Sequence, residues 1–203
     1  MRIPALPLLA LSLAISGCFG TSPPARFFVL SPDAAGQAAP ASTGPEGALG
    51  VFPTRVAEYL DRPQIVTFRT DNAVELDEYA RWAEPLGAGV TRVLAQELSA
   101  LLPAWRVVPQ PWDPTIPLRA RVVVSVTALG WNQQGQARLD ATWAVLSSSG
   151  DEVLARGRSV LRRDVAGKGT DAAVAATSAL VGDMAHEIAA AVKALPPRGQ
   201  GAR

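Results

Sequence analysis

Leu118–Leu129, with the sequence LRARVVVSVTAL, is the stretch that decides the fold of this chain. Two sets of side chains alternate along it, as in a β-strand with one buried face: Val122, Val124 and Val126 against Arg121, Val123 and Ser125. Two further β-rich stretches follow at 137–146 and 153–163, separated by turn residues at Gly135 and at 149–151. The sequence therefore predicts an antiparallel meander of three strands with one solvated face.

Two amphipathic helices are expected beside this meander. Apolar residues recur every three or four positions from Leu86 to Leu102, between Pro85 and Pro103, and again over about 171–195. Thr170 or Asp171 is expected to cap the second helix. Shorter strands are expected at 26–30, 49–53, 65–69, 73–77 and 105–108. The predicted fold class is α+β, a largely antiparallel sheet with two amphipathic helices packed on one face.

The first 17 residues predict a lipoprotein signal peptide. The apolar run at 3–15 is shorter than the roughly 20 residues that a membrane-spanning helix needs. It ends in Ile15-Ser16-Gly17-Cys18, which resembles the bacterial lipobox, where the cysteine is diacylated and becomes the acylated N-terminus. Cys18, the sole cysteine, is therefore the predicted lipid-attachment residue; the alternative is an ordinary signal peptide. Phe19 follows it instead of the aspartate that retains such proteins at the inner membrane, which indicates the periplasmic face of an outer membrane.

Composition predicts a single domain behind this anchor. We expect a lipidated tether at 18–25, a domain at 26–195 with a flexible loop at 31–48, and a disordered tail at 196–203.

Charge and reactive side chains argue against several function classes. The 19 Lys and Arg against 18 Asp and Glu give a net charge of +1, which disfavours nucleic-acid binding. One cysteine and one histidine exclude an internal disulfide or a Cys/His zinc site, and His186 is expected on the surface. We expect no catalytic residue, metal or cofactor. The arginines of 153–163 are expected to be neutralised by Asp151, Glu152 and Asp164.

The segment that connects the 73–77 strand to the first helix is the candidate partner-binding site. Tyr79, Arg81, Trp82 and Glu84 lie in it, and Tyr, Trp and Arg are enriched at interface hot spots. The alternative for Trp82 is that it closes the core beneath the helix.

The same segment carries a family resemblance. The box Trp82-Ala83-Glu84-Pro85-Leu86, followed by a helix closing on Leu102-Pro103-Ala104-Trp105, resembles the PqiC-type lipoproteins, auxiliary lipoproteins of ABC-type MCE transport systems. The lipobox, Phe28-Val29-Leu30 and Arg62-Pro63-Gln64-Ile65-Val66 agree with it, so that the likeness covers about 25–195.

The resemblance implies an outer-membrane lipoprotein that is held in the inner leaflet by its lipid anchor and docks an MCE-domain protein spanning the periplasm. Such a system would move lipids between the inner and outer membranes with a separate ATPase, and a homo-oligomeric ring is consistent with the family. Only Cys18 transfers as a functional residue. A different reading is a periplasmic lipid-binding carrier, which requires an apolar pocket of about 300 Å³ or more. An envelope hydrolase is the weakest alternative.

Overall fold

The structure, a computed structural model, describes residues 23–32 and 46–196. Strands β7 (Leu118–Trp131), β8 (Gln136–Ser147) and β9 (Val153–Asp164) form the predicted antiparallel meander. The predicted signal peptide, the tether up to residue 22 with Cys18, most of the 31–48 loop and the tail after Pro196 lie outside the described residues.

The meander belongs to a six-stranded sheet with the order β6-β2-β7-β8-β9, in which β3 (Arg55–Val56) also pairs with β7. Strand β2 (Gly47–Val51) runs parallel to both β6 (Trp105–Pro109) and β7, so this sheet is mixed. Its parallel pairs follow from the connections, because helix α2 lies between β2 and β6 in sequence and parallel strands need such a crossover. The last two residues of the expected loop already belong to β2.

A second sheet has three strands in the order β1-β5-β4. Strands β4 (Gln64–Thr70) and β5 (Ala73–Trp82) form the hairpin that the sequence predicts, but β5 continues five residues past the expected end at Asp77. It does so because its last three residues pair in parallel with β1 (Arg26–Phe28), a partner remote in sequence. The short 3₁₀ helix η2 (Glu58–Leu60) precedes β4.

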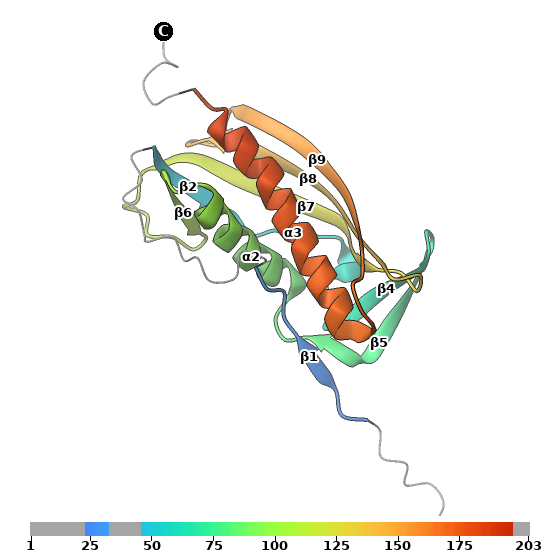
Figure 1. The fold of residues 1–203 in the computed structure, drawn as a ribbon. Coiled ribbons are helices and arrows are strands. Elements are labelled where there is room, and N and C mark those ends of the chain that lie inside the picture. The colour runs from blue at the N-terminus through green and yellow to red at the C-terminus, as the bar shows by residue number, and fades with distance from the viewer. Residues whose placement is uncertain (1–22, 33–45, 197–203) are drawn as a thin grey trace, which may run out of the picture.

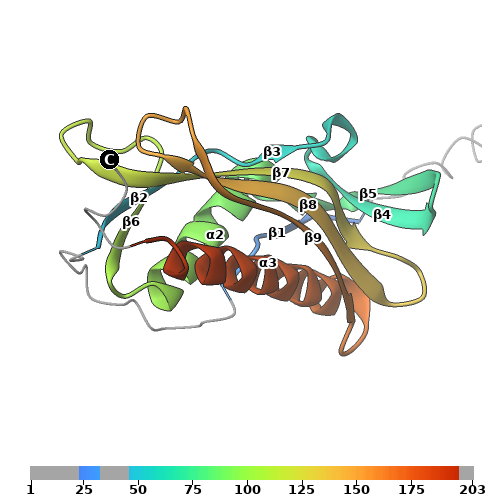
Figure 2. The same cartoon turned by 90° about the horizontal axis from the view of Figure 1, so that it is seen from above.

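Helices α2 (Leu86–Leu101) and α3 (Gly169–Lys193) lie together on one face of the six-stranded sheet, as predicted (Figures 1 and 2). The N-cap of α3 is Lys168, so the expected cap at Thr170 or Asp171 was wrong. Asp171 lies in the first helical turn instead, where a carboxylate is favoured by the helix dipole, and it pairs with Arg26 at 2.6 Å. In the described part of the chain no helix is both long and apolar enough to cross a bilayer.

The apolar core fills the space between the helices and the inner face of the sheet, with Leu49, Leu94, Leu139, Met184 and Ile188 fully buried. A polar chain also crosses this layer. The indole Nε1–H of Trp143 on β8 donates to Ser159 Oγ on β9 at 3.1 Å, and that hydroxyl donates to the carboxylate of Glu187 on α3. Both α-helices pack on this inner face, so no α-helix of the described residues covers the opposite face of β7, β8 and β9 (Figure 2). We call that opposite side the helix-free face.

Candidate functional site

Trp82, the central residue of the predicted partner-binding segment, lies in the core. Its side chain is 8% exposed and packs in the same apolar cluster as Phe28 and Leu86. Its backbone N–H donates to the Pro63 carbonyl at 2.7 Å, which ties the end of β5 to the start of β4. Of the two interpretations of Trp82, the structure supports core packing.

Glu84 has an internal partner as well. It accepts hydrogen bonds from Arg92 on α2, with 3.2 Å between Nε and Oε1, and Arg92 also donates to the Leu30 carbonyl at 2.8 Å. This pair fixes the first turns of α2 against the chain that follows β1. Glu84 therefore contributes mainly to the position of the helix.

Tyr79 and Arg81 remain at the surface. They share the outward face of β5, where Arg81 is the register partner of Phe27 on β1. Phe27, Val29 and Tyr79 are 66%, 48% and 46% exposed. We name Phe27, Val29, Tyr79 and Arg81 the β1–β5 surface. Sequence reasoning missed Phe27, although a Phe27-Phe28 doublet in a strand can place only one of its rings in a core.

The arginines of β9 are only partly neutralised. Arg158 binds both carboxylate oxygens of Asp140 on β8, at 3.0 and 2.6 Å, and this hydrogen bonding lowers the pKa of Asp140. Arg163 binds Asp183 on α3 at 2.8 Å. The expected partners Asp151, Glu152 and Asp164 were therefore wrong, because the carboxylates come from neighbouring elements.

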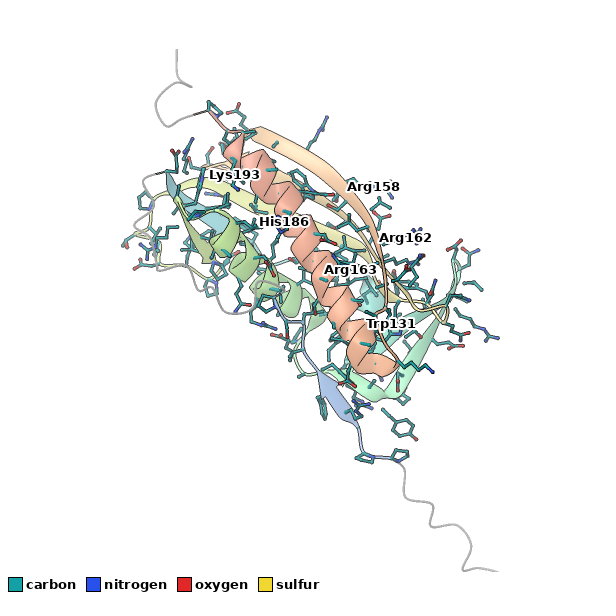
Figure 3. The ribbon with its side chains drawn as sticks, viewed as in Figure 1. Trp131, Arg158, Arg162, Arg163, His186 and Lys193 are labelled. Carbon is teal, nitrogen blue, oxygen red and sulfur yellow. The ribbon has the colours of Figure 1, made fainter. Side chains whose placement is uncertain are left out.

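Figure 3 labels Arg158, Arg162 and Arg163 on β9 and His186 on α3. His186 is exposed, as predicted. Arg156 and Arg162 have no carboxylate within 4 Å among residues 23–32 and 46–196.

A groove with a volume of about 980 Å³ lies on the helix-free face of the sheet. One wall is formed by residues 52–55, which connect β2 to β3 and include the first residue of β3, and the floor is the outward surface of β7 and β8. The lining side chains that face it are apolar or small and polar, with an arginine on each side: Phe52, Pro53, Arg55, Val123, Ser125, Thr142, Ala144 and Arg156. The sequence predicts this face to be solvated and gives no sign of the groove, because the 52–55 wall comes from outside the meander.

Comparison with known proteins gives a family and a fold. The model of a family described as "ABC-type transport auxiliary lipoprotein component" matches residues 28–189. No curated protein matches the chain in sequence.

Two solved structures share the fold. One is a crystal structure of an uncharacterized protein, with a TM-score of 0.70 and 19% identity over 84% of this chain and 99% of that one. Another, from Xanthomonas campestris, has a TM-score of 0.66 and 16% identity over 83% of this chain and 97% of that one.

Proposed function

The chain belongs to the family of ABC-type transport auxiliary lipoprotein components, and we propose that it is an outer-membrane lipoprotein acting as a non-enzymatic docking subunit of an MCE-type lipid-transport system. Its partner would be an MCE-domain protein that spans the periplasm, and the system would exchange lipids between the inner and outer membranes. The family description supports the transport role, and the lipobox supports anchoring through Cys18.

The β1–β5 surface is the observation that carries the docking role. It presents an exposed tyrosine, an exposed phenylalanine and an arginine beside one another, the residue types that dominate interface energetics. Arg81 has one ion-pair partner in the described chain, Glu78 at 3.4 Å, and such an exposed pair is weak enough to yield to another carboxylate.

The position of this surface fits a membrane-anchored dock. Pro23 lies five positions after Cys18, so a fully extended chain spans at most about 18 Å between them. The acyl chains would thus hold β1 close to the bilayer. A partner bound at the β1–β5 surface would end next to the membrane with which it exchanges lipid.

Homo-oligomerisation is part of the proposal. Strand β9 is the last strand of its sheet, and Val153, Leu154 and Val160 on it are exposed. A long edge strand with exposed apolar side chains favours pairing with another strand. Head-to-tail pairing of β9 with β6, the opposite edge strand of a second copy, would extend the sheet, and repetition of that contact would build a ring.

A periplasmic lipid carrier is the second candidate function. The groove on the helix-free face favours it, because its volume of about 980 Å³ exceeds the minimum for a lipid site.

The test is a pull-down of the full-length protein from detergent-solubilised envelopes, read by native mass spectrometry. We expect an acylated protein that brings down an MCE-domain protein, and we expect a Tyr79→Ala/Arg81→Ala variant to lose that protein. Lys193→Ala, which removes an exposed cation from the far end of α3, is the matched control and should keep it. An acylated monomer that holds one lipid and no protein would refute the docking role and favour the carrier.

A further inference from the structure

The groove on the helix-free face combines a partly apolar floor with two cationic sides. Val123 and Ala144 face outward from adjacent strands and are register partners, so they form a short apolar strip. The polar register pair Ser125 and Thr142 borders this strip. Phe52 and Pro53 form the wall beside it. Phe52 is itself held in place by the edge of Trp112, with ring centroids 5.1 Å apart. A single extended hydrocarbon chain fits such a strip, because each methylene gains about 0.8 kcal/mol when it leaves water.

The two arginines of the groove lie on its opposite sides. Arg55 on β3 is the register partner of Ser125, and Arg156 on β9 is the register partner of Ala144. Three strand spacings separate β3 from β9, or about 14 Å. Neither arginine has a carboxylate within 4 Å in the described ranges, and no acidic residue lines the groove. The groove is therefore complementary to an anion.

Thr54 attaches the wall of the groove to helix α2. Thr54 lines the groove and is 7% exposed, and its Oγ1 has no hydrogen-bond partner in the described part of the chain. The backbone of Thr54 is fixed, since its N–H donates to Thr91 Oγ1 on α2 at 2.8 Å. The Oγ1 of Thr54 has almost no solvent-accessible area, so Thr54 holds the wall in place and does not itself contact a ligand in the groove.

We propose that this groove binds an anionic phospholipid, with an acyl chain on the Val123–Ala144 strip and the phosphate at the β9 side of the groove, held by Arg156, while Arg55 adds positive charge on the β3 side. Arginine suits a phosphate because its guanidinium donates two parallel hydrogen bonds. The volume of about 980 Å³ lies at the upper end of the range of small-molecule sites, about 300–1,000 Å³. This assignment rests on the second candidate function and gives it a site and a lipid class; it is independent of the docking role.

The chain offers a matched control for the charge. Arg158 lies on β9 two residues from Arg156 and faces the same side of the sheet, but it is bound to Asp140 and does not line the groove. Arg156→Gln and Arg158→Gln thus make the same chemical change at neighbouring exposed positions, and only the first removes a charge from the groove. Ala144→Phe places a large side chain over the apolar strip. Because Ala144 faces away from the core, this change should block the groove and leave the core packing intact.

The experiment measures lipid retained by the full-length protein in detergent micelles, by native mass spectrometry, where covalent acyl groups are separated from bound lipid by mass. Phosphatidylglycerol and phosphatidylcholine with identical acyl chains are the probes. We expect one phosphatidylglycerol per chain and weaker retention of phosphatidylcholine. Arg156→Gln should weaken phosphatidylglycerol binding about tenfold, the effect of losing a charge-assisted hydrogen bond, and Arg55→Gln/Arg156→Gln should weaken it further. Arg158→Gln should leave it unchanged, and Ala144→Phe should abolish binding of both lipids.

Three outcomes would overturn the assignment: no lipid retained by the wild-type protein, equal losses for Arg156→Gln and Arg158→Gln, or full binding in Ala144→Phe. Binding of inorganic phosphate as tight as that of phosphatidylglycerol would also overturn it, because the acyl chain would then contribute nothing to binding. Circular dichroism of each variant separates lost binding from lost folding. The docking role would fail by a different result. In that case the pull-down would contain no MCE-domain protein, while the protein would still retain lipid.

Discussion

Replacing Trp82 with alanine tests whether this residue belongs to the core or to an interface. Its side chain is 8% exposed, so almost all of its surface leaves water on folding. A tryptophan buries about 150–250 Å², which at about 25 cal/mol per Å² corresponds to about 4–6 kcal/mol. Alanine keeps a small part of this contact, and the cavity that remains adds to the loss. We expect the free energy of unfolding to fall by about 3–5 kcal/mol.

Urea unfolding of the protein, followed by circular dichroism, measures this loss, and the melting temperature should fall by about 6–20 °C. Tyr79→Ala is the control, because Tyr79 lies on the same strand but is 46% exposed; we expect it to cost less than about 1 kcal/mol. The reasoning is refuted if Trp82→Ala loses less than about 1 kcal/mol, or no more than the control, since a residue of the core cannot be removed so cheaply.

Three further changes test other parts of the structure. Gly157→Ala should lower the free energy of unfolding by about 1–3 kcal/mol, because the new Cβ would lie 2.3 Å from Cζ2 of Trp143 and the ring is held by a hydrogen bond; an unchanged urea midpoint would show that the ring moves freely. Arg158 lowers the pKa of Asp140, so their pair stabilises the fold above the unfolded carboxyl pKa of about 3.9 and stops doing so as the pH falls through the lower folded pKa. The difference in unfolding free energy between wild type and Asp140→Asn should therefore be largest near pH 6 and shrink toward pH 2, and a pH-independent difference in urea titrations would contradict this. Cys18→Ser should move the protein from the membrane fraction to the soluble periplasmic fraction, as read by fractionation and immunoblotting, and continued membrane association would exclude the lipid anchor as the cause of attachment.

The helices and the meander could be predicted because their signals are local. The 3.6-residue periodicity of Leu86–Leu101 and the alternation of valines in Leu118–Trp131 each depend on residues a few positions apart. The exposed position of His186 follows in the same way from its place on the helix. The α+β class follows from the order of these elements.

The partners of the arginines and the end of β5 could not be predicted, because they depend on residues brought together by folding. Asp164 lies on the same strand as Arg158 and close to it in sequence. The ion-pair partner of Arg158 is nevertheless Asp140, which the sheet register brings close to it on the neighbouring strand β8. Strand β5 reaches Trp82 only because β1 supplies a parallel partner.

The sequence by itself determined the α+β class, the two amphipathic helices and the three-stranded meander of this protein, since periodicity, prolines and turn residues act over a few positions. It also supplied the lipobox around Cys18 and the family resemblance that the comparisons confirmed. Only the tertiary structure decided that Trp82 faces the core and that a groove with Arg55 and Arg156 forms on the helix-free face. A side chain's burial and a groove's walls depend on contacts between segments that are distant in the chain, and the local pattern of either segment does not encode those contacts.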